Sequence, residues 1–420
     1  METMVKNNLQ NFALTNNIFS SNQHGFLPNR STCTQLLESQ YNWCKALDKN
    51  IITDVILIDF SKAFDVVPHN KLVSKLASMG VCMPTLRWIH AFLYGRFQSV
   101  SLNGTVSKQS AVTSGVIQGS VLGPTLFTFY VNDLPTACPD CTIEQFADDT
   151  KASRQIVTPH DRVRLQQSVN GLCDWADQHE LKLSLDKCIY LQIGYCDNTI
   201  AYTVGSHTLQ PCTSTTDLGI AVQSNLKPGL HCTNIATKAN ARAKLILKSF
   251  LSHDASTLTR AFITFVRPLL EYATPVWNPH FKGDIKVIED VQRGFTRKLF
   301  YLCNLTPTNY NNRMLLLGLQ RLELRRIFND LCTMFKLTHG LIICKLQHEI
   351  RYAPHAGTRG HKYKLYVSPT HKLVLSTHFM HRTVPIWNYL PEQCFNPDTY
   401  LPFRAKIRKI DFSRFLIDND

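Results

Sequence analysis

Adjacent carboxylates at Asp148 and Asp149 are the first candidates for chemistry in this 420-residue chain. They follow Phe146 and Ala147, and the four residues are typical of a tight turn between two short strands. An Asp-Asp pair by itself is commonly a solvated turn, because aspartate hydrogen-bonds to its own backbone there. Together with Asp59, far upstream, the pair favours a two-metal site for nucleotidyl transfer.

The segment that leads to Asp59 predicts a buried strand. Residues 55–58 are apolar throughout, with no polar alternation to mark a side that faces solvent. An acid at the end of such a strand either caps the helix that follows or is held at the sheet edge to bind a cation. These residues alone leave both alternatives open.

A magnesium site needs few protein ligands, because Mg²⁺ prefers oxygen donors and keeps several of its waters. Asp59 and Asp148 supply the minimum, and a turn would let Asp149 approach as well. We expect Asp148 to be the main ligand, since consecutive strand residues point to opposite faces. The prediction is therefore two Mg²⁺ ions, or Mn²⁺ in their place, about 3.5–4 Å apart.

A glycine-rich loop lies between these acids. Residues 113–124 contain three glycines and end at Pro124, which suits the first turn of the apolar helical pattern that follows. Glycine permits close backbone approach, so the loop could lie against a nucleotide or base pair that Gln118 orients. An ordinary entry from loop to helix fits the same residues equally well.

Four motifs in one order carry a family resemblance. The chain resembles the reverse transcriptase of a non-LTR retrotransposon, of the jockey or CR1-like LINE kind. The motifs are Gln-His-Gly-Phe (23–26) with Arg-Ser-Thr (30–32), Asp-Phe-Ser-Lys-Ala-Phe-Asp (59–65), Gln-Gly-Ser-Val-Leu-Gly-Pro (118–124) and Phe-Ala-Asp-Asp (146–149).

The resemblance implies an α+β fold of the right-hand polymerase type. Its palm would be an antiparallel sheet with packed helices, preceded by partial fingers and followed by a helical thumb and a C-terminal region. The implied divisions are fingers and palm over 1–222, a thumb-like region over 223–300 and a basic, mostly helical region over 301–420.

The resemblance also implies an activity, an RNA-directed DNA polymerase that extends the 3′-OH of a DNA primer with dNTPs on an RNA template. Phe64, where RNA polymerases of this fold usually carry a polar residue, would exclude the ribose 2′-OH. Core packing is the alternative for Phe64, and a plain surface lysine is the alternative for Lys187. The implied roles are metal ligands at Asp59, Asp148 and Asp149, contacts to nucleotide and template base at Gln118 and Gly119, a proton donor to pyrophosphate at Lys187, a triphosphate contact at Arg30 and a primer grip at 217–220.

Family members carry an amino-terminal endonuclease and longer fingers, so the resemblance implies that this sequence is truncated at its amino terminus. Incomplete fingers would weaken nucleotide binding, because positioning supplies much of the rate of such transfers. The alternative function is therefore an inactive retroelement remnant that only binds nucleic acid.

Composition and charge fit a nucleic-acid partner. The formal net charge is +14, and residues 281–420 hold 22 lysines and arginines against 11 acids. Such a surplus favours RNA or DNA as partner, although an ordinary basic surface remains open. Without an apolar run of about 18 residues or a signal-peptide core, we expect an intracellular protein, in nucleus or cytoplasm, with no membrane partner.

Two groups of cysteine and histidine residues are candidates for zinc sites. Cys138 and Cys141 have the spacing of half a site, without a second pair at matching distance. A looser group has irregular spacing, and a closed zinc site needs four tetrahedral ligands, so structural zinc is not favoured. The looser group is Cys344, His348, His355 and His361.

Periodicity predicts helices around the palm and behind it. The expected segments are 68–79, 85–94 and 161–180, a basic thumb helix around 238–244, and amphipathic helices around 321–328 and 404–409.

Overall fold

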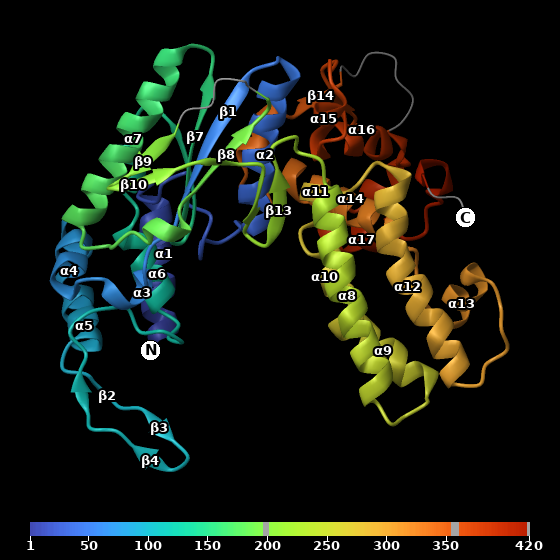
Figure 1. The fold of residues 1–420 in the computed structure, drawn as a ribbon, viewed down its shortest axis with the longest axis horizontal. Helices are drawn as coiled ribbons and strands as arrows, with labels where there is room; N and C mark the ends of the chain where they lie inside the picture. Colours follow the sequence, from blue (N-terminus) through green and yellow to red (C-terminus); the bar gives the residue numbers. More distant parts are fainter. Residues whose placement is uncertain (196–200, 354–360, 418–420) are drawn as a thin grey trace. The chain divides into compact units, whose positions relative to one another are not determined.

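The computed structural model describes residues 1–195, 201–353 and 361–417. The chain divides into two compact units, the first comprising residues 1–35 and 51–213 and the second residues 36–50 and 214–420 (Figure 1). The predicted boundaries at residues 222 and 300 stay a prediction.

A mostly antiparallel sheet forms the centre of the first unit. Its strand order is β11-β8-β1-β7-β6, with β1 (Ile52–Ile58) in the middle. Strand β1 pairs antiparallel with β7 (Asp149–Ile156) and with β8 (Ile189–Ile193), while β6 (Thr142–Phe146) closes one edge and β11 (Pro211–Cys212) the other. The predicted buried strand is confirmed: Val55 and Ile56 are fully buried.

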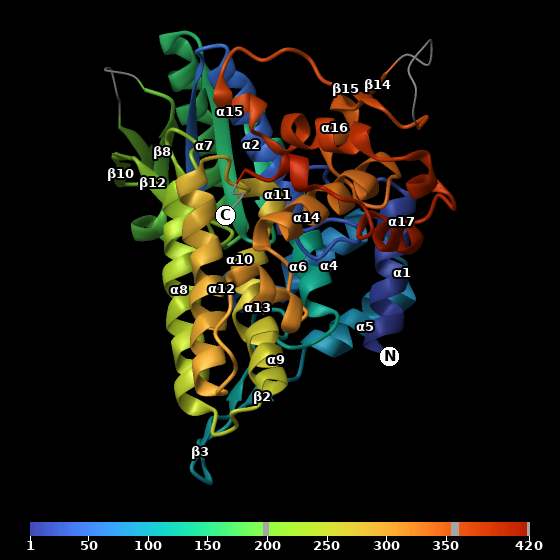
Figure 2. The same ribbon diagram turned by 90° about the vertical axis from the view of Figure 1, so that its right-hand side faces the viewer.

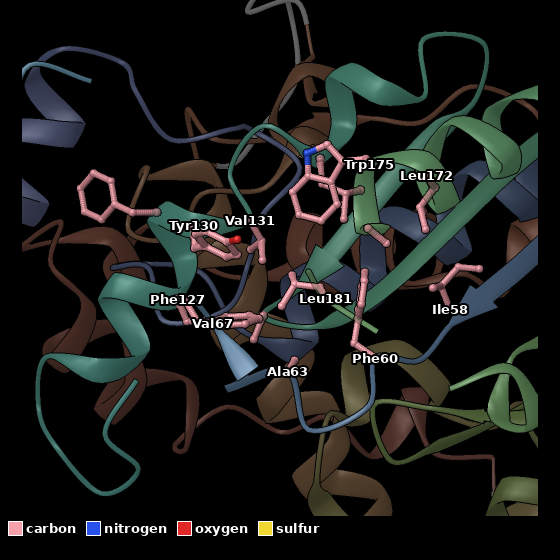
Figure 3. Close-up of a cluster of buried hydrophobic side chains, with 14 of the residues drawn as sticks. Ile58, Phe60, Ala63, Val67, Phe127, Tyr130, Val131, Leu172, Trp175 and Leu181 are labelled. Carbon is pink, nitrogen blue, oxygen red and sulfur yellow. The ribbon is translucent and has the colours of Figure 1, made fainter. Parts of the chain in front are cut away.

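Helices pack on this sheet through apolar side chains. The core joins Ile58 and Phe60 to Phe127 and Tyr130 of α6 (Gly123–Tyr130), and to Trp175 of α7, as Figure 3 shows. Helix α7 (Pro159–Gln178) runs along the sheet and begins with a capping box between Thr158 and Asp161 (Figure 1). Burial of such side chains from water is the main force that holds these layers together.

The helices predicted around the palm are confirmed, with ends shifted by a few residues. Helix α4 covers His69–Ser78 and α5 covers Met83–Leu93. The helix α4 buries Leu72 and Leu76 as expected, and Gly80 follows with φ +87°. The remaining helices of this unit are α1 (Glu2–Thr15), α3 (Ala63–Val66) and the 3-10 turns η1 (Leu134–Ala137) and η2 (Leu185–Lys187).

A narrow β ribbon extends away from the sheet of the first unit in both views (Figures 1 and 2). Its strands β2 (Phe97–Gln98) and β5 (Ser110–Ala111) pair, and β3 (Ser101–Leu102) pairs with β4 (Thr105–Val106). All four strands are exposed. A separate hairpin joins β9 (Tyr202–Val204) to β10 (His207–Leu209).

The second unit is mainly helical, as predicted for the region behind the palm. Helix α8 (Gly229–Ser249) contains the predicted basic segment and lies beside α12 (Lys282–Leu302) (Figures 1 and 2). A hairpin of β12 (Ser214–Asp217) and β13 (Ile220–Gln223) precedes α8. Most of α2 (Thr32–Asp48) also belongs here, from Leu36 onward.

The remaining elements of the second unit are short, apart from α14. Over the described residues, the chain holds no helix with the length and apolar character needed to cross a membrane. The elements are α9 (Ala255–Phe265), α10 (Arg267–Glu271), α11 (Thr274–Trp277), α13 (Tyr310–Leu316), α14 (Leu322–Thr338), η3 (Lys345–Glu349), β14 (Arg351–Tyr352), β15 (Leu365–Tyr366), α15 (Leu373–Ser376), α16 (Phe379–Tyr389), η4 (Glu392–Phe395), α17 (Tyr400–Ile407) and η5 (Ser413–Phe415).

Candidate active site

Asp59 follows directly on β1, at the end of the central strand. Its carbonyl accepts a hydrogen bond from the backbone N–H of Ser184 at 2.8 Å, and Ser61 N–H donates to the carbonyl of Lys182 at 2.7 Å. Helix α3 begins at Ala63 with Lys62 as its N-cap, so the helix-cap alternative for Asp59 is wrong. The backbone of Asp59 is instead held at the end of the strand by the chain segment that leads into β8.

Asp148 lies in a two-residue turn. Phe146 at the end of β6 pairs with Asp149 at the start of β7, so Ala147 and Asp148 form the connection. Two-residue loops are the commonest hairpin connections. The predicted tight turn is confirmed, but Asp149 is the first residue of the strand and is exposed, while Asp148 is half-buried.

The carboxylates of Asp59 and Asp148 interact. Burial raises the pKa of Asp148, and the negative charge of Asp59 raises it further. Asp59 Oδ2 also lies 3.2 Å from Nζ of Lys187, whose side chain is 72% exposed. The two carboxylates supply oxygen donors of the kind that a hard divalent cation prefers.

A three-ligand cluster is not present among the residues that the structure describes. In that part of the chain, no group of three or more His, Cys, Asp or Glu side chains could hold a metal ion. None of the zinc candidates in that part of the chain belongs to such a group. They are Cys138, Cys141, Cys344, His348 and His361. His355, which completed the looser zinc candidate, lies outside the described residues.

Phe64, the expected gate, lies on α3 and is half-buried. Its ring stacks on Phe127 with centroids 4.1 Å apart and an interplanar angle of 18°. Phe26 meets it edge-on, with centroids 6.1 Å apart. Core packing therefore holds one part of the ring, while another part stays accessible. Phe26 also contacts Phe146, the last residue of β6, with centroids 6.5 Å apart.

The glycine-rich loop is bonded to the segment that carries Phe64. Val116 N–H donates to the carbonyl of Phe64 at 2.8 Å. A Cβ at Gly115, where φ is +90°, would lie 2.6 Å from the carbonyl oxygen of Asp65, so only glycine fits there. Gln118 Nε2 donates to Oδ1 of Asp65 at 2.6 Å, and Gly119 next to it has φ +80°. The loop thus brings Gln118 to Asp65, the residue that follows Phe64.

The guanidinium of Arg30 binds backbone carbonyl groups. Its Nη1 donates to the carbonyls of Ser20, Ser21 and Gln23, at 3.0 Å and 3.1 Å for the first two. These contacts fix the loop before α2. A role toward triphosphate stays a prediction.

Sequence reasoning gave no role to Gln23, although it opens the first motif. The structure brings its side chain to Ala147, beside Asp148, across 124 residues of chain. The signal that could have found it is Gly25, two residues on, since glycine at a motif position marks close backbone approach.

Comparison with known proteins gives the family. The model of the family described as reverse transcriptase (RNA-dependent DNA polymerase) matches residues 1–219, just over half of the chain. The chain belongs to the reverse transcriptase family. The resemblance stated from the motifs is thereby confirmed, and the α+β fold of the right-hand polymerase type with it.

Relatives of this reverse transcriptase include mobile-element polymerases of flies. It is 25% identical over 319 residues to the RNA-directed DNA polymerase from mobile element jockey of Drosophila melanogaster, covering 71% of this chain and 34% of that protein. It is 24% identical over 300 residues to the probable RNA-directed DNA polymerase from transposon X-element of the same species, covering 67% and 32%. The chain thus spans about a third of the length of these relatives.

Among solved structures, the apo telomerase of Candida tropicalis matches with a TM-score of 0.44 and 10% identity, covering 78% of this chain and 55% of that one. The assignment of the fold rests on the family match and on the strand order of the sheet rather than on this likeness.

Proposed function

We propose that this reverse transcriptase is an RNA-directed DNA polymerase that extends a primer 3′-OH with dNTPs on an RNA template. The observation that carries the proposal is that Asp59, at the end of β1, lies near enough to Asp148, in the turn between β6 and β7, for its charge to raise the pKa of Asp148. Phe26 contacts both Phe64 and Phe146, the residue before that turn. Two neighbouring carboxylates supply negative charge and oxygen donors that suit a divalent cation. Membership of the reverse transcriptase family supports it.

Reverse transcriptases generally use divalent metals, and Asp59, Asp148 and Asp149 are the proposed ligands here. When bound, two Mg²⁺ ions supply a lowered pKa for the primer hydroxyl and neutralise charge on the leaving pyrophosphate. Asp59 and Asp148 provide the negative charge, and Asp149 has an exposed carboxylate one residue further. Lys187 is proposed to hold the proton that the pyrophosphate takes.

Phe64, Gln118 and Gly119 are the proposed nucleotide contacts. The accessible part of the Phe64 ring would crowd a ribose 2′-OH, and its stacking on Phe127 keeps the ring from turning away. Gln118, bonded to Asp65 next to that ring, would orient the sugar and base. Positioning of this kind supplies much of the rate of phosphoryl-type transfers.

The second unit offers basic surface for the template and primer. The side chains of Lys238, Arg242, Lys244 and Lys248 on α8 are exposed. We propose that they contact the phosphate backbone, which fixes the duplex without selecting a sequence. The hairpin of β12 and β13, which turns at Leu218 and Gly219, is the proposed primer grip.

Primer extension tests the proposal. The purified chain is given an RNA template, a DNA primer, Mg²⁺ and dNTPs, beside the Asp148→Ala variant and with rNTPs in a parallel reaction. We expect DNA synthesis that Asp148→Ala abolishes and that rNTPs support poorly. Salt-sensitive RNA binding without extension by either protein would overturn it in favour of the inactive remnant.

A further inference from the structure

The side chain of Gln23 is completely buried and contacts the turn that carries Asp148. Its Oε1 accepts hydrogen bonds from the backbone N–H groups of Gly25, at 2.7 Å, and Ala147, at 2.8 Å. Its Nε2 donates to the carbonyl of Ala147 at 3.2 Å. The side-chain amide of Gln23 therefore binds both the N–H and the carbonyl of Ala147, the residue before Asp148.

Ala147 needs such a restraint. Its φ is +57°, a left-handed conformation that residues with a Cβ rarely adopt. Strain of this kind persists only where the surroundings over-determine it, and it gathers at functional sites. The hydrogen bonds that Gln23 makes with the N–H and the carbonyl of Ala147 supply a restraint of this kind.

The loop that carries Gln23 is itself anchored. His24 N–H donates to the carbonyl of Gln145 on β6 at 2.9 Å, and Gln145 N–H donates to the carbonyl of Asn22 at 2.9 Å. Arg30 binds the carbonyl of Gln23 from the other side. These hydrogen bonds fix the backbone on both sides of the Gln23 side chain.

Close packing completes the arrangement. A Cβ placed on Gly25 would lie 2.3 Å from the backbone nitrogen of Ala147, far inside contact distance. Only glycine lets the loop approach the turn closely enough for Gln23 to reach the N–H and the carbonyl of Ala147. Gly25 therefore allows the contact with Ala147 that Gln23 makes.

We propose that Gln23 is a positioning residue, which fixes the Ala147-Asp148 turn so that Asp148 stays beside Asp59 in the arrangement that binds divalent metal. The inference rests on the proposed function, because it assigns Gln23 to the same metal site. Partners that orient a metal ligand from outside typically change metal affinity 10- to 100-fold when they are removed.

Gln23→Met tests this role, because methionine keeps most of the buried volume and removes the hydrogen bonds. Mn²⁺ binding is measured by electron paramagnetic resonance in the absence of nucleic acid, with Asp148→Asn defining the site. We expect about tenfold or weaker Mn²⁺ affinity in Gln23→Met. The Mg²⁺ concentration for half-maximal primer extension should rise in parallel.

Gln192→Met is the matched control. Gln192 is a buried glutamine on β8, and its Nε2 donates to Oδ1 of Asp54 and to the hydroxyl of Tyr190. Neither partner belongs to the turn that carries Asp148. It should lower the melting temperature and leave Mn²⁺ affinity unchanged. An equal loss of Mn²⁺ affinity in folded Gln192→Met would overturn the specific role of Gln23.

Ala147→Gly should restore Mn²⁺ affinity to Gln23→Met if the loss comes from the turn. It should not restore it if the loss comes from general destabilisation of the fold. Glycine adopts φ +57° without penalty, so the turn would depend less on Gln23. In the Gln23→Met background, Ala147→Gly should recover part of the Mn²⁺ affinity. Unchanged Mn²⁺ affinity in folded Gln23→Met, or no recovery in the double variant, would overturn the proposal.

Failure of the two proposals can be told apart. Mn²⁺ binding that depends on Asp148 and weakens in Gln23→Met, in a chain that extends no primer, would support the role of Gln23 and overturn the polymerase. Mn²⁺ binding that Asp148→Asn leaves unchanged would overturn the metal site and the role of Gln23 together.

Discussion

The two ends of strand β1 each carry an aspartate, and their surroundings are opposite. Asp54 is fully buried and accepts hydrogen bonds from the hydroxyl of Tyr202 at 2.7 Å, from Gln192 at 3.3 Å and from Arg162 at 3.3 Å. Asp59 is partly exposed, pairs with the exposed Lys187, and faces the like charge of Asp148.

The difference separates a structural carboxylate from one available for chemistry. A buried charge is tolerated when a cation and hydrogen-bond donors compensate it, as they do at Asp54. At the other end, Asp148 and Asp59 repel each other, and a divalent cation bound there, as we propose, would relieve that repulsion. We therefore distinguish a structural end of β1 from a proposed functional end, and the predictions below test that division.

The largest effect is expected for Asp59→Asn. The amide keeps the shape of the side chain and removes the charge that would hold divalent metal, so primer extension should fall by about 10⁴-fold, in line with several kcal/mol of transition-state stabilisation. Steady-state extension kinetics measure it. Extension within tenfold of wild type would mean that Asp59 is not at the functional end.

Asp54→Ala should act on stability instead. The variant removes the buried carboxylate that accepts hydrogen bonds from the Tyr202 hydroxyl and from Arg162, at a cost of about 3 kcal/mol in the free energy of unfolding. Urea denaturation followed by circular dichroism measures it. Extension per folded molecule should stay near wild type, and a specific loss of extension would contradict the comparison.

Lys187→Met should reduce extension by about 10²-fold if the lysine supplies the proton to pyrophosphate. Stability should change by no more than about 0.5 kcal/mol, because the ion pair with Asp59 is exposed on the lysine side. Single-turnover extension and thermal melting measure the two quantities. A variant with full extension would leave Lys187 as a surface lysine.

The smallest effect is a gain of stability in Asp148→Asn at neutral pH. The pKa of Asp148 lies above its ordinary value, so its ionisation costs more in the folded than in the unfolded chain. Stability from this group is therefore greatest below the unfolded pKa, about 4, and is lost as the pH rises through the folded pKa. At pH 7 the variant should melt a few degrees higher, and near pH 3 the difference should vanish.

The prediction from sequence succeeded where local pattern carries the information. The apolar run at 55–58 predicted a buried strand, and the doublet after Phe146 predicted a turn, because strand burial and turn preference depend on neighbouring residues. Both elements are present where expected. The helices around the palm followed from their periodicity in the same way.

Local pattern failed for partners that are distant in sequence. The cap alternative for Asp59 could not be decided until the N-cap of α3 was known. The contact of Gln118 with Asp65 spans 53 residues, and that of Gln23 with Ala147 spans 124. Such contacts depend on how elements pack, and several packings would satisfy the same hydrophobic pattern.

The sequence by itself determined the residue types of the site and the elements that carry them, since strand, turn and helix follow from spacing and from the conformational preferences of each residue. Only the tertiary structure decided which carboxylate of β1 is compensated, that Asp148 lies within electrostatic reach of Asp59, and that Gln23 bonds to Ala147 beside it. These depend on burial and on the directions of side chains, which are fixed when the sheet and its helices pack together.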